Sequence, residues 1–225
     1  VLGQNDAPIA EDISSETNED QSVIVVLTAT DIDSNNLLYS LSEVEDDQPE
    51  LGVVEITGSF ATYTPYEDNW GMDSFVFIVS DGELSDAANV VVNINPVNDP
   101  PQIFDIPIQE SPEDQIFVYT IDAVDVDGDQ LTYEPVQSQN AAVWIDTELI
   151  DEESVSNINI SPVSNWYGQL SIQFSASDGV YTVFEDFIIN VLPVNDPPVA
   201  NSMMIPLDED ESAYFSLDGV DIDDL

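Results

Sequence analysis

Short runs in which apolar and polar residues alternate predict β-strands along the whole chain. In the run after Gln21 every second side chain is apolar, and the same alternation returns twice further along. A period of two indicates a strand with one buried face, whereas a period of 3.6 would indicate a helix, and no segment keeps the helical period for long. The expected inner-face positions of this run and its two copies are Val23, Val25, Leu27 and Ala29, then Phe117, Tyr119, Ile121 and Ala123, and finally Ala213, Phe215, Leu217 and Gly219. Two later runs of the first repeat alternate in the same way, with Phe75, Phe77 and Val79, and Val90, Val92 and Ile94, expected on the inner face.

The first part of the chain contains enough such runs for a complete sandwich. Seven strands in roughly 100 residues is the count of an immunoglobulin-like fold. We therefore predict an all-β protein made of tandem β-sandwiches. The expected strands of the first sandwich are 9–14, 22–30, 37–42, 53–56, 59–64, 74–80 and 87–95.

A repeated Pro-rich hexapeptide sets the predicted domain boundaries. Pro96-Val97-Asn98-Asp99-Pro100-Pro101 returns as Pro193-Val194-Asn195-Asp196-Pro197-Pro198, and acidic pairs, Asp-x-Asp motifs and Ser-Asp-Gly turns recur in the same register. A central strand cannot continue through Asp-Pro-Pro, and the prolines stiffen the joint. We expect one repeat at 1–96, a second at 97–193, and the N-terminal part of a third at 194–225.

Composition removes most kinds of catalytic and binding chemistry. The chain has 47 acidic residues, no Lys, Arg, His or Cys, and a formal charge of -47. It therefore has no imidazole base, lysine amine or thiolate, and it repels nucleic acid and anionic lipid surfaces. No apolar run approaches the ~20 residues of a membrane span. We predict that the chain is not an enzyme, although a carboxylate pair remains open. Val1 is interpreted as a cut or processed end.

Strand direction brings acidic residues together where repeats meet. Strands of a sandwich run alternately up and down, so the acidic pair after the first strand and the Asp-x-Asp after the second lie at opposite ends. When repeats stack, these ends face each other. At the first junction we expect Glu19, Asp20, Glu67 and Asp68 to face Asn98, Asp99, Asp125, Asp127 and Asp178. At the second we expect Glu113 and Asp114 to face Asn195, Asp196, Asp221 and Asp223.

Calcium is the cation that suits such clusters. Crowded carboxylates repel one another unless some are protonated or a cation neutralises them. Calcium takes 6–8 oxygen ligands in irregular geometry, magnesium needs a tighter octahedron, and zinc prefers the absent His and Cys. The loop that begins at Asp125 is not an EF-hand, because Gln130 replaces its glycine and Val136 its final glutamate.

These motifs resemble those of a known family. The Asp-x-Asp motifs, the acidic pairs and the Asn-Asp-x-Pro linkers look like the calcium-binding elements of cadherin repeats. The stretch from Tyr63 through Asn69-Trp70-Gly71 to Ser80-Asp81-Gly82 resembles bacterial cadherin-like repeats of large surface adhesins. The resemblance implies calcium at both junctions. Ser164-Asn165 replace Glu67-Asp68 in the second repeat, so we expect fewer or weaker ions at the second junction.

The leading hypothesis is an extracellular, cell-surface stalk or filament segment made rigid by calcium. Its expected partners are neighbouring repeats of the same or identical chains. Strand addition to the incomplete third repeat, or completion of an N-terminal half-site by another copy, would build a head-to-tail filament. The half-site residues are Asp6, Asp31, Asp33 and Asp81.

Two alternatives from other classes remain open. One is a carbohydrate- or protein-ligand-binding module, and the other is an accessory region of a secreted enzyme. Exposed tryptophans would favour the ligand-binding module, but we expect Trp70 and Trp166 to pack in the core or in loops. Asn159-Ile160-Ser161 is a formal glycosylation sequon inside an expected strand, and we interpret it as a chance occurrence.

Overall fold

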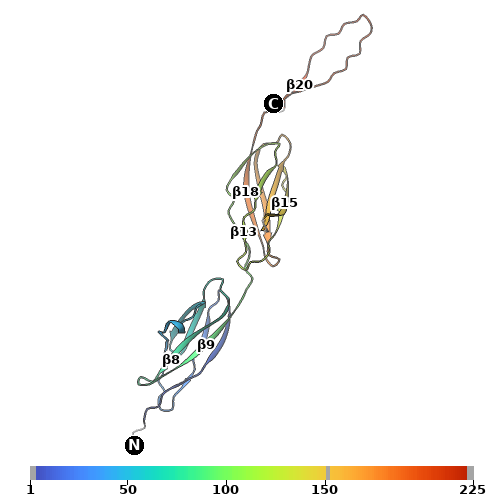
Figure 1. Ribbon diagram of the computed structural model, residues 1–225. Coiled ribbons are helices and arrows are strands. Elements are labelled where there is room, and N and C mark those ends of the chain that lie inside the picture. The colour runs from blue at the N-terminus through green and yellow to red at the C-terminus, as the bar shows by residue number, and fades with distance from the viewer. Residues whose placement is uncertain (1–3, 151–152, 222–225) are drawn as a thin grey trace. The chain divides into compact units, whose positions relative to one another are not determined.

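The computed structural model describes residues 4–150 and 153–221, and it confirms an all-β protein with immunoglobulin-like topology (Figure 1). The chain divides into two compact units, the first ending at Asn98 and the second beginning at Asp99. Among the described residues, no helix has the length and apolar character needed to cross a membrane.

The first unit is a sandwich of two sheets. One sheet has the order β2-β9-β8-β5, and the other has the order β3-β7-β6. Strand β2 pairs in parallel with β9, and the other pairs are antiparallel. The element bounds are β1 (Ile9–Ala10), β2 (Ile13–Asn18), β3 (Val23–Val26), β4 (Ala29–Thr30), β5 (Leu38–Leu41), the short 3-10 helix η1 (Glu45–Asp47), β6 (Gly52–Thr57), β7 (Phe60–Pro65), β8 (Gly71–Ser80) and β9 (Ser85–Asn95).

The expected first strand is divided between two partners. Strand β1 pairs with β4, and the chain then crosses to the other sheet, where β2 joins β9. Acidic side chains fix the crossing point. Asp86 accepts a hydrogen bond from the Ala10 amide at 2.9 Å, and Asp12 accepts one from the Asn89 amide at 2.8 Å. The expected first strand thus takes part in two sheets, the two-stranded sheet β1-β4 and the sheet β2-β9-β8-β5.

The core of the first unit follows the alternating pattern. Val25 and Leu27 are buried, while Val23 and Ala29 at the ends of the same face are partly buried. The strands β8 and β9 contribute side chains that are almost completely excluded from solvent, which confirms the inner face expected for them. These are Phe75, Phe77 and Val79 on β8, and Val90, Val92 and Ile94 on β9.

A buried hydrogen-bonding pair interrupts this apolar core. Asp73 is only 5% exposed and accepts a 2.6 Å hydrogen bond from the hydroxyl of Tyr63, which is completely buried. The same carboxylate accepts the backbone amides of Glu50 and Leu51, both at 2.9 Å. Burial, followed by the hydrogen bond to Asp73, raises the pKa of Tyr63, so its hydroxyl stays protonated as a donor. The pair thus fastens the loop before β6 to the core.

The second unit repeats the strand order of the first. Its sheets have the orders β11-β18-β17-β14 and β12-β16-β15, and β11 is again parallel to the last strand. The bounds are β10 (Gln102–Ile103), β11 (Gln109–Pro112), β12 (Phe117–Thr120), β13 (Ala123–Val124), β14 (Thr132–Val136), β15 (Ala141–Ile150), β16 (Glu153–Pro162), β17 (Gly168–Ser177) and β18 (Thr182–Leu192).

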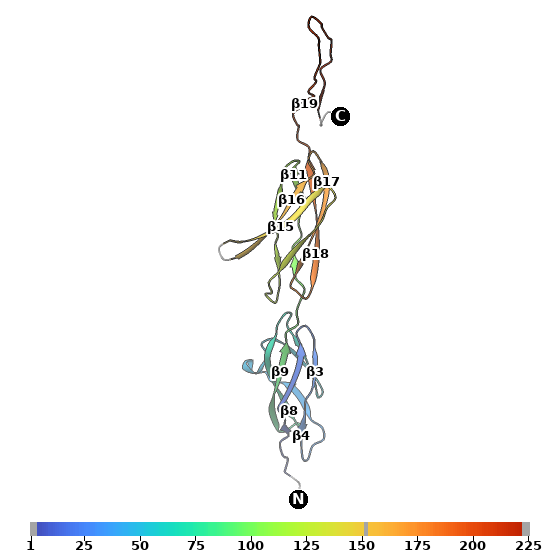
Figure 2. The ribbon, with the colours of Figure 1, turned by 90° about the vertical axis from the view of Figure 1, so that its right-hand side faces the viewer.

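One hairpin distinguishes the second unit from the first. Strands β15 and β16 have 10 residues each, whereas the corresponding β6 and β7 have 6 each. Figure 2 shows the β15–β16 hairpin extending away from the rest of the unit. The core-facing side of its base is filled by Val143, Ile158 and Ile160. Beyond Asp146 and Asn157, the described residues of these two strands have strand partners only in each other.

Between Pro198 and Asp221, the last described residue, the chain forms two short strands, β19 (Val199–Ala200) and β20 (Gly219–Val220), which pair with each other. The inner face expected for Ala213, Phe215, Leu217 and Gly219 is exposed here, with Phe215 at 58% and Leu217 at 91%. Two strands cannot cover a sandwich face, since each side chain needs a facing sheet to exclude water. The assignment of this segment to a third repeat remains a prediction.

Candidate metal centres

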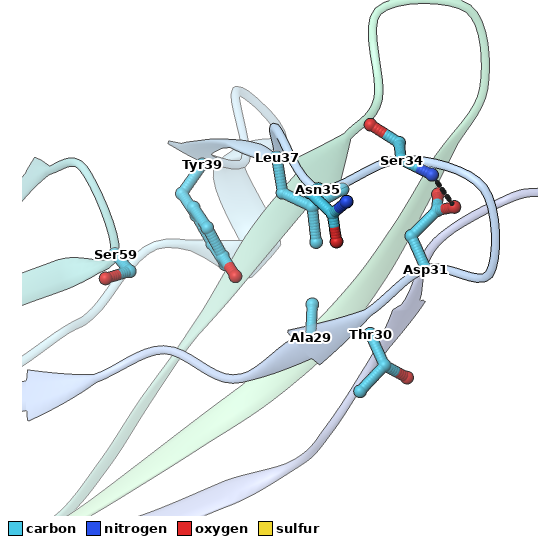
Figure 3. Close-up of a pocket in the computed structure, with 8 residues that line it drawn as sticks. All are labelled: Ala29, Thr30, Asp31, Ser34, Asn35, Leu37, Tyr39 and Ser59. Carbon is cyan, nitrogen blue, oxygen red and sulfur yellow. Dashed lines mark hydrogen bonds between the residues drawn. The ribbon is translucent and has the colours of Figure 1, made fainter.

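The Asp-x-Asp loop of the first unit holds one carboxylate in a fixed orientation. Asp31 Oδ1 accepts the backbone amides of Asp33 at 2.9 Å and Ser34 at 2.8 Å, the second of which is drawn in Figure 3. Asp31 Oδ2 is buried and has no hydrogen-bond partner among the described residues. Asp33 in turn accepts the Asp6 amide at 3.1 Å. The loop therefore presents an ordered carboxylate oxygen whose hydrogen-bonding capacity is unused.

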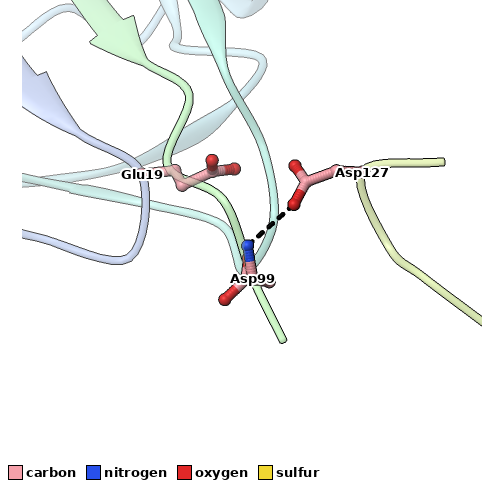
Figure 4. A group of neighbouring side chains, drawn as sticks. All are labelled: Glu19, Asp99 and Asp127. Atoms are coloured by element: carbon pink, nitrogen blue, oxygen red, sulfur yellow. Dashed lines mark hydrogen bonds between the residues drawn. The ribbon is translucent and has the colours of Figure 1, made fainter. Parts of the chain in front are cut away.

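The second unit repeats this loop at equivalent positions. Asp125 Oδ1 accepts the amides of Asp127 at 3.0 Å and Asp129 at 3.3 Å, and its Oδ2 is buried without a hydrogen-bond partner in the described part of the chain. Asp127 accepts the Asp99 amide at 2.8 Å (Figure 4). Asp99 and Asp127 each offer a carboxylate oxygen within 4.8 Å of the other. Because the carboxylates of Asp31 and Asp125 each accept two backbone amides of the loop that follows them, this loop geometry belongs to the repeated fold.

A third carboxylate joins the loop at this end of the first unit. Asp81 Oδ1 accepts the amides of Glu83 at 2.7 Å and Leu84 at 2.8 Å, and Oδ2 accepts the side-chain amide of Asn5 at 2.7 Å. In the second unit Asp178 makes the same turn, accepting the amides of Val180 at 2.7 Å and Tyr181 at 2.6 Å. In the first unit, the two acidic turns and the segment of Asn5 and Asp6, which donates to both of them, thus lie at one end.

Backbone donors set the acidity of these groups. Hydrogen bonds from the amides of Asp33 and Ser34 lower the pKa of Asp31, although its burial and the like charge of Asp81 act in the other direction. The amides of Leu84 and Glu83 lower the pKa of Asp81. The ordinary value for an unfolded Asp is about 3.9. A carboxylate whose pKa is lower in the folded state than in the unfolded state stabilises the fold above about pH 4. This stabilisation is lost as the pH falls toward and through the folded-state pKa.

We expect Asp81→Asn to reduce the pH dependence of the first unit. The variant lacks the stabilised carboxylate, so its free energy of unfolding at pH 6 is lower than that of the parent. For the same reason, its free energy of unfolding decreases less between pH 6 and pH 3. Hydrogen exchange of amides in β8 and β9 at the two pH values measures this difference. An equal acid-induced loss in the parent and the variant would contradict the assignment.

The opposite end of the first unit combines a buried acid with an acidic pair. Glu19 is 3% exposed and accepts the Val97 amide at 2.5 Å, which ties the linker to this end. Asp20, with φ 58°, accepts the Asp68 amide at 3.1 Å, and carboxylate oxygens of these two residues lie within 4.8 Å. Both Asp20 and Asp68 have positive φ, a conformation that Asp tolerates better than most residues. Glu67 is exposed, and its backbone carbonyl accepts a hydrogen bond from the Asn69 side chain at 2.8 Å.

The corresponding end of the second unit has the same plan with one substitution. Glu113 is 3% exposed and accepts the Val194 amide at 2.7 Å. Asp114 accepts the Ser164 hydroxyl at 3.0 Å and the Asn165 amide at 2.9 Å. In the orientation that satisfies its neighbours, the Asn165 side chain donates to Asp114 Oδ2 at 3.2 Å and Asp196 Oδ2 at 2.8 Å. A neutral amide thus occupies the place that Asp68 has in the first unit, and the expectation of fewer ions there stays a prediction.

The predicted ligands are partly gathered by the structure. Within their own units it groups Asp20 with Asp68, Asp99 with Asp127, and Asp114 with Asp196. Asn195 donates to the carbonyl of Asp196 at 3.0 Å, Asp221 is partly buried, and Asp223 lies outside the described residues. The sequence analysis gave no role as hydrogen-bond donors to Asn5 and Asn165. Their side chains are uncharged and therefore do not stand out in a search for clustered acidic residues.

The tryptophan prediction is wrong for one of the two residues. Trp166 is partly buried and packs against the second core, as expected. Trp70, which directly precedes Gly71, is 59% exposed. Trp144, which the sequence did not single out, lies on β15 and donates to Asp146 at 3.1 Å.

A hollow of about 490 Å³ opens beside Asp31. The Tyr39 hydroxyl and the Asn35 amide point into it (Figure 3). A smaller hollow of about 270 Å³ lies beside Asp125 and includes the equivalent Tyr133. Their lining is mainly neutral, so these spaces differ in chemistry from the carboxylate clusters.

Comparison with known proteins finds a family match over the first unit and several similar solved structures. Residues 5–93 match the family model of the bacterial Ig domain. No curated protein matches the chain. Similar solved structures include human protocadherin-24 EC1-2, with 15% identity, TM-score 0.48 and coverage of 83% of this chain and 99% of that chain. The human desmocollin-1 ectodomain has 14% identity, TM-score 0.39 and coverage of 86% and 42%.

An endo-fucoidan hydrolase of glycoside hydrolase family 107, MfFcnA4, is also similar, with 18% identity, TM-score 0.38 and coverage of 86% of this chain. This chain spans 30% of the length of that hydrolase. The family match over the first unit agrees with its two-sheet topology, and the second unit repeats the same strand order. Residues 5–93 are therefore similar to a bacterial Ig domain, and the second unit repeats their strand order.

Proposed function

We propose that the chain is a calcium-binding structural segment of an extracellular surface adhesin, forming part of a rigid stalk or filament. The observation that carries this proposal is the duplicated Asp31 and Asp125 arrangement, in which one carboxylate oxygen is held by backbone amides and the other is buried without a hydrogen bond. We propose a structural role for the two units and no catalytic one.

A cation explains the unused oxygen better than burial alone. A buried charged oxygen with neither hydrogen bond nor counter-charge is costly, and the chain contains no Lys, Arg or His to neutralise it. Hard carboxylate and carbonyl oxygens are the ligands that calcium prefers. Asp127 and Asp99 add carboxylates beside the Asp125 loop of the second unit. Calcium bound there would hold the start of the second unit to its Asp-x-Asp loop.

The linker gives calcium a mechanical role in this proposal. Val97 is bound to Glu19 of the first unit, and Asp99 is bound to Asp127 of the second, so only Asn98 separates the two attachments along the sequence. Acids at both ends of such a short connection would repel one another without a cation. We propose that calcium removes this repulsion and stiffens the connection.

Asp125→Asn should reduce the number of bound calcium ions by at least one. The substitution keeps the size of the side chain but removes the charge that the cation needs. Native mass spectrometry with CaCl₂ counts the ions, and Asp186→Asn, an exposed site on β18, is the matched control. Equal stoichiometry in Asp125→Asn and the parent would reject Asp125 as a ligand.

Removal of calcium should shorten the protein in solution. A stiffened linker keeps repeats extended, whereas a free linker lets them sample bent arrangements. Small-angle scattering with calcium and with EGTA compares the maximum dimension. Identical dimensions in both conditions would argue against the rigid-stalk role while leaving calcium binding intact.

A further inference from the structure

We infer that the outer face of sheet β12-β16-β15 in the second unit binds an uncharged saccharide. Strand register places six side chains on this face in two rows across the three strands. The first row across β15, β16 and β12 consists of Trp144, Asn159 and Val118. The second row consists of Asp146, Asn157 and Thr120. Directly opposed side chains in a sheet are about 5 Å apart, which is about the width of one sugar ring.

Hydrogen bonds fix the polar groups of this face before any ligand arrives. Asp146 Oδ2 accepts the Trp144 indole N–H at 3.1 Å and the Asn159 side-chain amide at 3.2 Å. The Thr120 hydroxyl donates to Asn157 Oδ1 at 2.8 Å. Asp146 Oδ1 and the Asn157 side-chain nitrogen have no partner among the described residues. A fixed acceptor and a fixed donor therefore stand beside each other on neighbouring strands.

This combination fits a sugar better than other ligands. A hydroxyl both donates and accepts, so neighbouring hydroxyls of a ring can engage the Asp146 carboxylate and the Asn157 amide together. The Trp144 ring supplies a rigid apolar surface for the C–H face of the ring, and its N–H is already satisfied. The face has no cationic group and the chain carries a formal charge of -47, so sulfated and uronic-acid glycans are repelled.

The first unit shows that the fold does not require these residues. The equivalent positions there are Glu55 and Thr57 on β6, Thr62 and Phe60 on β7, and Ile24 and Val26 on β3. Phe60, Ile24 and Val26 are more than half exposed. Two copies of one sandwich thus carry different outer faces, and only the second combines an indole with fixed amides and a carboxylate. This points to a binding role beyond the structural role proposed for the repeats.

Indole N–H resonances provide a test in the unmodified protein. The chain has 3 tryptophans, so titration of the calcium-loaded protein with maltohexaose, cellohexaose, laminarihexaose, xylohexaose and mannohexaose reports on each residue separately. We expect at least one hexasaccharide to shift the Trp144 signal saturably and to leave Trp70 and Trp166 unchanged. The absence of a saturable shift with every hexasaccharide would overturn the inference. A parallel titration with hexalysine, a cationic peptide, would overturn it too if the Trp144 signal shifted with the peptide and with none of the hexasaccharides.

Two variants separate binding from hairpin stability. Trp144→Ala and Asn157→Ala should each weaken saccharide affinity at least tenfold, because they remove the stacking surface and the free donor. Trp70→Ala, which removes an exposed indole from the first unit, should leave affinity unchanged. Hydrogen exchange in β15 and β16 checks that the hairpin of each variant is intact. Unchanged affinity in Asn157→Ala with an intact hairpin would overturn the assigned site.

Discussion

Calcium will raise the thermal unfolding midpoint of the protein, and removing calcium with EGTA will reverse the increase. One site occupied at a hundredfold excess over its dissociation constant adds about 2.7 kcal/mol. One such site in each unit would stabilise that unit by this amount, and each kcal/mol shifts the midpoint of a domain of this size by roughly 4–8 °C. The gain is large because the folded state brings carboxylates together and the chain contains no basic side chain.

Ionic strength is the necessary control for this experiment. NaCl screens repulsion between the exposed carboxylates, so it should also raise the midpoint, but without saturating at millimolar concentration. MgCl₂ at the same concentration supplies the same divalent charge with stricter demands on geometry. Calcium should therefore act at far lower concentration than either salt. Equal effects of calcium and magnesium would indicate screening and count against a specific site.

Asp73→Leu will destabilise the first unit by about 3 kcal/mol or more. The second unit has Leu170 at the equivalent position on β17, so leucine is compatible with the strand. In the first unit, however, the change strands the Tyr63 hydroxyl and the amides of Glu50 and Leu51, all of which donate to Asp73. A buried donor without a partner costs about 1–3 kcal/mol. Chemical denaturation followed by hydrogen exchange in β8 measures the loss.

A second substitution tests whether the hydroxyl is responsible. Ile160 occupies the position of Tyr63 in the second unit, and Tyr63→Ile in the Asp73→Leu background removes the stranded hydroxyl. The double variant should therefore lose less stability than the two single variants added together. The second unit serves as the internal reference and should unfold as in the parent. Strict additivity of the two substitutions would show that the hydrogen bond contributes nothing.

The repeated loops of the candidate centres show how far sequence reasoning reaches. Up-and-down strand order was enough to place the Asp20 and Asp68 segments at one end of a unit, and the hydrogen bond between them agrees with that placement. The same reasoning could not show that Asp31 and Asp125 each leave one oxygen buried without a partner. That property depends on how the loop folds over the side chain, and the charge pattern does not contain it.

Local periodicity by itself determined the repeats, the all-β fold and the inner positions of β8 and β9, because a period of two and a packed face are short-range properties. Only the tertiary structure decided where polar groups are buried. At the start of β8, Met72 is 75% exposed and Asp73 is 5% exposed, the reverse of their polarity. Asp73 is tolerated inside because its donors come from Glu50, Leu51 and Tyr63, which are distant in sequence. Hydrogen-bond satisfaction is a property of assembled strands, and no local pattern encodes it.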